Sequence, residues 1–243
     1  MREVVDIDHS VPQDSGSSPP AKRNPRLAVG LDPMSNWKNR IQLSQMVRAY
    51  HIIFSTYGFW LPNDPRGSGS DEVHAKHLQQ FGPATKVQTR QSVAHQTHDY
   101  VIRRAAKEQL KYPLVIFNGL QARAVARGFA QVSSESDYPI YACAILPEHV
   151  HLVLGRHALA AERIISHLKR GATLRLFTEE IHPLINFKDA RGKVPSPWSK
   201  GSGWKVYLED DHAISNRIKY VNDNPIKDGK PPQNWGFVRP FEP

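Results

Sequence analysis

Two stretches of the chain, about seventy residues apart, contain side chains whose types and spacing could do chemistry. In residues 147–154 two histidines stand at alternate positions of an apolar run, and in residues 220–225 a tyrosine precedes an asparagine by four positions. Imidazole nitrogens and amide oxygens bind divalent cations, and a phenol can act as a nucleophile. Together these side chains are the parts needed for a metal-assisted attack by tyrosine on a phosphodiester.

The two histidines belong to a run that is typical of a buried strand. Side chains alternate along a strand, so His149 and His151 share one face while Val150, Leu152 and Leu154 share the other. Such a strand can anchor a core with one face and hold a divalent cation with the other. A His-x-His pair taken alone more often makes hydrogen bonds at a sheet margin. The tyrosine and the asparagine in residues 220–225 are what favour a metal site at this pair.

The tyrosine and the asparagine belong to a helical pattern. Asp210 or Asp211 can cap its start, and the pattern is expected to stop near Asn224 because Pro225 follows. At helical spacing Tyr220 and Asn224 lie on the same face, one turn apart. Each residue also has a structural interpretation, since a helical tyrosine often packs and an asparagine before proline often ends a helix.

The rest of the chain supplies strands and helices to position these two motifs. Runs rich in β-branched and aromatic residues predict strands at residues 47–57, 138–146 and 149–154, the last two being adjacent strands or one strand with a bulge at the intervening proline. Apolar periodicity predicts helices at residues 99–110, 118–132 and 158–180. Residues 204–208 are expected to form a short strand or turn.

Three segments have little apolar periodicity. Residues 1–46 are rich in proline and serine and are expected to be a disordered tail, because they offer too little apolar surface to offset the ordering entropy. A polar insertion covers about residues 62–98, and a proline-rich tail covers about residues 231–243. The remainder, residues 47–243, is expected to be one catalytic domain.

Composition narrows the classes of protein. A net charge of +9 and a pI of about 9.7 favour a polyanionic partner such as nucleic acid. Cys143 is the sole cysteine, which excludes an intrachain disulfide and a cysteine-rich zinc module. The sequence has no signal-peptide pattern and no apolar run of about 18 residues, so a soluble, cytoplasmic protein without a membrane partner is expected.

The motifs, taken together, resemble those of the HUH single-tyrosine transposases of bacterial insertion sequences. The closest similarity is to the REP-associated tyrosine transposases, which share a Pro-x-His-x-His strand, a helix with Lys and Arg, and a Tyr-x-x-x-Asn-Pro ending. The opening strand at residues 50–56 and the segment 203–208 also fit that family. The resemblance covers roughly residues 47–240.

The resemblance implies a fold, a site and a substrate. The fold is α+β: a ferredoxin-like or RRM-like antiparallel sheet of the HUH endonuclease type, with the two-histidine strand near its centre and helices packed on one face. His149 and His151 would bind Mg²⁺ or Mn²⁺, and Tyr220 would be the nucleophile. Asn224 stands where the insertion-sequence enzymes commonly have glutamine, so a third ligand would be one methylene shorter. The substrate would be hairpin-bearing single-stranded DNA, cut to a 5′-phosphotyrosine and a free 3′-OH.

Positive charge is concentrated between the two motifs. Residues 159–205 contain nine Lys and Arg against four Asp and Glu. Six side chains there are candidates for contact with DNA: Lys169, Arg170, Arg175, Lys200, Lys205 and Trp198. A charged helix face can equally be solvated, and Trp198 and Trp204 can stack on unpaired bases or belong to the core.

Three functions therefore remain open from the sequence. The first is a metal-dependent DNA nickase or strand transferase, and the second is a DNA-hairpin-binding regulator without turnover. The third is a metal hydrolase that uses a bound water, with Tyr220 in a structural role. A monomer and a homodimer are both compatible with the sequence, because a tyrosine helix can complete the site of its own chain or of a neighbour.

Overall fold

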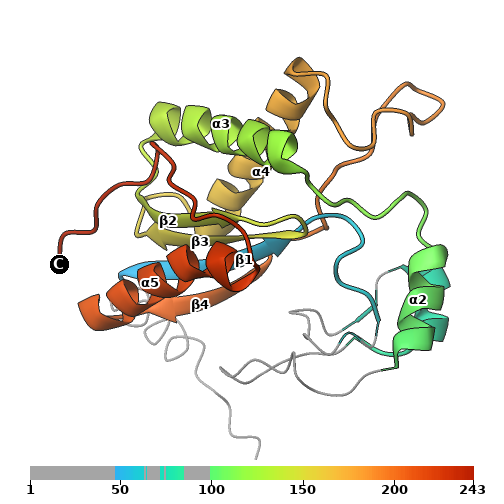
Figure 1. The fold of residues 1–243 in the computed structure, drawn as a ribbon, viewed down its shortest axis with the longest axis horizontal. Helices are drawn as coiled ribbons and strands as arrows, with labels where there is room; N and C mark the ends of the chain where they lie inside the picture. Colours follow the sequence, from blue (N-terminus) through green and yellow to red (C-terminus); the bar gives the residue numbers. More distant parts are fainter. Residues whose placement is uncertain (1–46, 63, 65–71, 74, 85–98) are drawn as a thin grey trace, which may run out of the picture. The chain divides into compact units, whose positions relative to one another are not determined.

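The computed structural model describes residues 47–62, 64, 72–73, 75–84 and 99–243 (Figure 1). The expected tail at residues 1–46 lies outside the described residues, as does most of the expected insertion at 62–98. In chain order the elements are β1 (Ala49–Ser55), the 3-10 helix η1 (Lys76–Phe81), α2 (Tyr100–Glu108), α3 (Gly119–Ser136), β2 (Ile140–Ile145), β3 (His149–Gly155), α4 (Ala161–Thr178), β4 (Trp204–Leu208) and α5 (Asp211–Lys227).

The four strands form one antiparallel sheet in the order β2-β3-β1-β4. The two-histidine strand β3 is therefore an inner strand, as expected, with β2 and β1 as its neighbours. The adjacent strands β2 and β3 form a hairpin, closed by a hydrogen bond from the Leu146 amide to the His149 carbonyl. This confirms the mixed α/β class with an antiparallel sheet and decides in favour of two strands over one bulged strand.

Each face of the sheet has its own apolar core. One core combines Ile52, Val150 and Leu152 of the strands with residues of α3 and α4, such as Phe129 and Leu168. Helices α3 and α4 cover this face, in agreement with the expected helical layer (Figure 1). This core is the larger of the two, and it anchors the strands from the face opposite the histidines.

The opposite face is covered by α5, which is a correction to the expected single helical layer. Ala142, Ala144 and Val153 of the sheet pack there against Ile214 and Val221 of α5. The small side chains of Ala142 and Ala144 allow α5 to lie close to β2. The His149 and His151 side chains share this face, so the tyrosine helix and the histidines meet in the same layer.

Helix α5 also runs further than the sequence indicated. Of the two expected caps, Asp210 caps the start by accepting a hydrogen bond from the Ala213 amide, and Asp211 is the first helical residue. The helix passes through Pro225 and ends at Lys227, one turn beyond the expected stop. Proline removes one backbone N–H, which costs one hydrogen bond but leaves the φ angle compatible with a helix. The extra turn places the Lys227 side chain near Tyr220 on the same helix.

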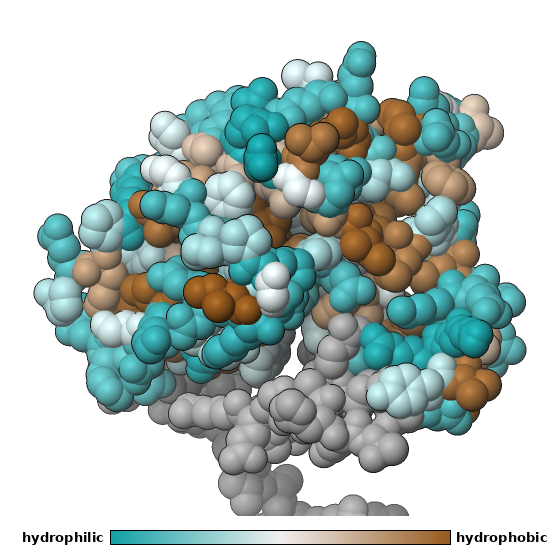
Figure 2. All heavy atoms as spheres, in the orientation of Figure 1, coloured by the Kyte–Doolittle hydropathy of each residue, from teal (hydrophilic) through white to brown (hydrophobic). Residues whose placement is uncertain are grey.

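No helix in the described part of the chain is long and apolar enough to cross a membrane. On the face drawn in Figure 2, hydrophobic side chains form separate patches among hydrophilic ones.

Candidate active site

The predicted pair of histidines is joined by a third, His51 of β1. Cross-strand pairing places Ile53 beside His151 and Val153 beside His51, so the two histidines are diagonal neighbours on the α5 face. The Nε2 atom of His51 lies 3.1 Å from Nδ1 of His151. The two rings are nearly parallel, with centroids 5.3 Å apart. Both side chains are almost fully buried.

His51 was not among the site residues predicted from the sequence. A signal was present, since His51 is a histidine within an otherwise apolar strand run, at a position that alternates with Ala49 and Ile53. Its meaning depends on the register between strands that are 100 residues apart, and that register is set only by folding.

His149 lies at the more exposed end of the cluster. Its ring centroid is 4.9 Å from that of His151, and on its other side it stacks on Phe59 at 5.1 Å. As predicted, His149 and His151 share a face of β3, and the aromatic contact with Phe59 restricts the orientation of the outer ring. The three imidazoles thus form a continuous row across β1 and β3.

Tyr220 of α5 lies against this row. Its ring centroid is 5.7 Å from that of His51 and 5.8 Å from that of His151, both in edge-to-face geometry. The side chain is 38% exposed, so the phenol borders the histidines while staying open to solvent. One chain therefore supplies the tyrosine and the histidines of the same cluster.

Two cations lie over the Tyr220 ring. The guanidinium carbon of Arg217 is 5.2 Å from the ring centroid and the Lys227 ammonium is 5.1 Å from it. Neither forms an ion pair with a carboxylate among the described residues. Arg217, Tyr220, Asn224 and Lys227 follow the spacing i, i+3, i+7, i+10, which places them on one side of α5.

Both cations were missing from the prediction based on sequence. Arg217 stands one turn before Tyr220, so its helical spacing was readable. Lys227 was overlooked because the helix was expected to stop before it. The positive charge near the phenol is therefore higher than the sequence-based prediction implied.

Asn224 is turned toward its own helix. Its Nδ2 atom donates to the Tyr220 carbonyl oxygen at 3.0 Å. This hydrogen bond engages the amino group of the amide and leaves the amide oxygen as the atom that could approach a cation. The predicted proximity of Asn224 to Tyr220 is present, whereas its role as a ligand stays a prediction.

Burial keeps the inner histidines neutral. Burial lowers the pKa of His51 to about 3, with a further contribution from the Arg217 charge. Burial also lowers the pKa of His151 well below its usual value, and the charges of His149, His51 and Arg217 add to this effect. A neutral imidazole retains a nitrogen lone pair, which is the form that binds a metal ion.

The donor chemistry of the cluster fits a divalent cation that keeps open positions. His51 Nδ1 is buried without a hydrogen-bond partner among the described residues, so the cluster contains an unsatisfied nitrogen. Within the same residues, no three or more His, Cys, Asp or Glu side chains are placed to hold one ion. A cation at His149 and His151 therefore needs oxygen donors from Asn224, water or a phosphate, which suits Mg²⁺ or Mn²⁺.

The predicted DNA contacts of α4 lie away from this cluster, because α4 packs on the other face of the sheet. Arg170 is exposed there, and Arg175 lies near Glu179 at 3.7 Å. Lys169 donates to the carbonyl oxygens of Ser199 and Gly201 at 3.0 and 2.8 Å. Its ammonium group therefore ties α4 to the loop before β4.

The remaining candidate DNA contacts, Lys200, Lys205 and Trp198, differ in how accessible their side chains are to DNA. Lys200 is exposed, whereas Lys205 forms an ion pair with Glu162 of α4. Trp198 is 4% exposed and packs on Phe54, so it belongs to the core and cannot stack on a base, which corrects that prediction. Trp204 is the tryptophan on the histidine face, because it pairs across the strands with Ile53.

The fold is similar to those of several solved structures, two of which are described below. No family model matches the chain, and no curated protein matches it by sequence. One similar structure is a REP-associated tyrosine transposase bound to a REP hairpin, with 11% identity, coverage of 75% of this chain and 68% of that chain, and a TM-score of 0.38. The other is a proposed transposase from Deinococcus radiodurans R1, with 14% identity, coverage of 75% and 90%, and a TM-score of 0.32.

Both identities are below 25% and both TM-scores are below 0.5. At such low identities and TM-scores the similarity carries no inference about chemistry. The chemistry open to this protein therefore depends on its own side chains.

Proposed function

We propose that the protein is a metal-dependent single-stranded DNA endonuclease and strand transferase with Tyr220 as its nucleophile. The observation that carries this proposal is the position of the Tyr220 ring, 5.7 and 5.8 Å from the rings of His51 and His151 in the same chain. Packing alone does not require two buried imidazoles and two cations next to a tyrosine. A nucleophile that attacks a phosphodiester needs both a cation site and positive charge.

The reaction exchanges one phosphoester for another. The Tyr220 hydroxyl oxygen bonds to phosphorus, and the bond from phosphorus to the 3′ oxygen breaks. The products are a 5′-phosphotyrosine and a free 3′-OH, so that overall one proton passes from the phenol to the departing oxygen. The linkage keeps the energy of the phosphodiester, and the reverse reaction joins strands without ATP.

Arg217 and Lys227 lie on either side of Tyr220 along α5, where they are suited to bind the phosphate that the tyrosine attacks. They stand one turn before and two turns after Tyr220 on the same side of α5, without carboxylate partners among the described residues. A guanidinium or ammonium group near a phosphate forms short, charge-assisted hydrogen bonds. Such contacts would hold the scissile group against the phenol.

His149 and His151 are the proposed protein ligands of the cation. The stacking of Phe59 on His149 and the hydrogen bond between His51 and His151 orient the two rings before an ion binds. When bound, the ion would polarise the scissile phosphate and stabilise charge on the departing 3′ oxygen.

A DNA-hairpin-binding regulator without turnover is the second candidate. It is favoured by the short Asn224 side chain, whose amide bonds to its own helix, and by the lack of a third His, Cys, Asp or Glu ligand in the described part of the chain. In this alternative the cations of α5 hold DNA, and the tyrosine does not react.

A covalent-adduct assay separates the candidates. Wild type and Tyr220→Phe are incubated with hairpin-flanked single-stranded DNA and Mn²⁺, and denaturing gels report protein joined to DNA. An adduct in wild type only supports the transferase. Binding without cleavage in both proteins supports the regulator. Cleavage that survives in Tyr220→Phe supports a hydrolase that uses water, and contradicts the proposed nucleophile.

A further inference from the structure

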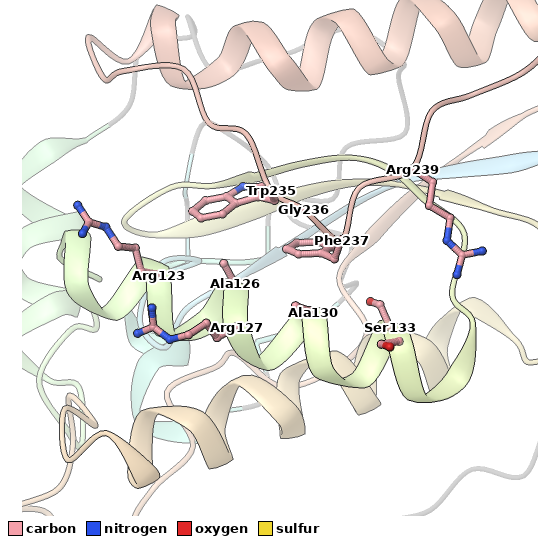
Figure 3. Close-up of a pocket in the computed structure, with 10 residues that line it drawn as sticks. Arg123, Ala126, Arg127, Ala130, Ser133, Trp235, Gly236, Phe237 and Arg239 are labelled. Atoms are coloured by element: carbon pink, nitrogen blue, oxygen red, sulfur yellow. The ribbon is translucent and has the colours of Figure 1, made fainter.

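A groove lies between α3 and the segment after α5 (Figure 3). Helix α3 packs on the face of the sheet opposite α5, the helix that carries Tyr220. The volume of the groove is about 640 Å³. One wall is the outer side of α3, and the other is formed by residues 235–239. The Tyr220 cluster contributes no residue to it.

The shape of the groove comes from small side chains and two fixed rings. On the α3 wall, the small side chains of Ala126 and Ala130 leave space in the groove. The rings of Trp235 and Phe237 lie across from them (Figure 3). The two rings are nearly parallel, at 16°, with centroids 6.5 Å apart. Phe237 is anchored edge-to-face on Phe129 of the core, at 6.3 Å. The aromatic wall is therefore held in position before any ligand arrives.

Three arginines surround the rings: Arg123, Arg127 and Arg239. Arg123 has no ion pair among the described residues. Arg127 and Arg239 pair with Glu179 and Asp137, respectively. The exposed single contact between Arg239 and Asp137 contributes little to stability, so a phosphate can replace Asp137 at small cost, whereas Arg127 holds Glu179 by two hydrogen bonds.

Aromatic rings and guanidinium groups together match the two parts of a nucleotide. A guanidinium forms two parallel hydrogen bonds to a phosphate, and a base stacks on an aromatic ring. Stacking is available to a base only where the strand is unpaired. The carboxylates of an acidic peptide would use the arginines but would not stack on the rings.

The chain itself connects the groove to the tyrosine helix. After α5, the Gln233 side chain makes two hydrogen bonds to the backbone of Ile145, and the Arg239 amide donates to the Ile140 carbonyl. These bonds fix the segment along the free edge of β2. The segment that forms the aromatic wall is therefore continuous with the tyrosine helix and is held against the sheet.

We propose that the groove binds unpaired nucleotides of a DNA strand, as a second binding site for the substrate cut at Tyr220. This proposal rests on the proposed function only in taking DNA as the polymer. The groove itself contains none of the proposed catalytic residues.

The test compares the full-length double variant Arg123→Gln/Arg239→Gln with Arg163→Gln, an exposed arginine of α4 that lies outside the groove. The probe is a fluorescein-labelled oligothymidylate, and anisotropy reports affinity over a range of salt concentrations. We expect the double variant to bind at least about tenfold more weakly, with a salt slope lower by about 1.4, because two phosphate contacts are removed. The Arg163→Gln control is expected to change affinity by less than about twofold, since its guanidinium lies outside the proposed path of the strand.

Photocrosslinking locates the binding site directly. An oligothymidylate carrying 4-thiothymidine is expected to crosslink to the peptide that contains Trp235 and Phe237, and Phe237→Leu is expected to lower the yield without changing the salt slope. Equal binding by the double variant and the control overturns the proposal, as does equal competition by an acidic peptide. The adduct assay with Mn²⁺ is run on the same wild-type protein, so a wild type that crosslinks at this peptide but forms no adduct contradicts only the proposed catalysis.

Discussion

His51 Nε2 lies 3.1 Å from His151 Nδ1, so a single proton is shared between the two nitrogens. When that proton belongs to His151 Nδ1, the lone pair of His151 Nε2 is free for a cation, and His51 acts as the acceptor that fixes this tautomer. Histidine ligands commonly donate their second ring N–H to such a partner. The relationship makes His51 a positioning residue for the proposed ligand.

The first prediction concerns this partner. We expect His51→Ala to weaken Mn²⁺ binding by about 10–100-fold, because His151 is deprived of the acceptor that orients it. His51→Gln should retain more affinity, since its amide oxygen can accept the same hydrogen bond. Calorimetric titration of Mn²⁺ measures both. Equal affinity of His51→Ala and wild type would show that this hydrogen bond has no part in cation binding.

The second prediction concerns the cations of α5. Arg217→Gln and Lys227→Gln should each weaken single-stranded DNA binding by roughly 5–100-fold and lower the salt slope by about 0.7, because each removes a phosphate contact. Lys219→Gln is the matched control, since Lys219 lies on the same helix but pairs with Asp223 at 3.1 Å. The assignment fails if all three variants bind alike.

The third prediction separates the two candidate functions at Asn224. If the amide oxygen is a ligand, Asn224→Ala should lower cleavage and Mn²⁺ affinity together, while Asn224→Gln, with a longer reach, should preserve or increase both. A protein that only binds DNA should show no response of Mn²⁺ affinity to either change. Quenched-flow cleavage and metal titration provide the two readouts.

The fourth prediction concerns the tryptophans. Trp198→Ala should lower the free energy of unfolding by about 3–5 kcal/mol, because it empties a core position. It also removes the indole donor to the Lys169 carbonyl. Trp204→Ala should cost less, as its ring is only partly buried. Urea unfolding tests both, and an equally large destabilisation by Trp204→Ala would contradict the difference in packing.

The fifth prediction is a pH dependence of stability at Lys169. Burial lowers the pKa of Lys169 from 10.5 to about 8 in the folded protein. Between these values the unfolded chain binds more protons, so the free energy of unfolding should rise with pH across this window, by on the order of 1–3 kcal/mol. Lys169→Met should remove the rise. Denaturant melts from pH 7.5 to about 10.5 provide the comparison, and parallel curves would contradict it.

The sequence determined the local elements and the two motifs. Alternation within β3 placed His149 and His151 on one face, and Asp210 marked the start of α5. The spacing of Tyr220 and Asn224 placed them on one side of that helix. These features depend on residues that are near in sequence, and such patterns are readable because strands repeat every two residues and helices every 3.6.

Only the tertiary structure decided which residues share the site. It paired β1 with β3 and so brought His51 to His151, and it placed α5 and α4 on opposite faces, which removed Lys169 from the neighbourhood of Tyr220. It also carried α5 through Pro225 and added Lys227. Strand register and the choice of face depend on contacts between distant segments, and the packing of two separate cores fixes them only when the whole chain has folded.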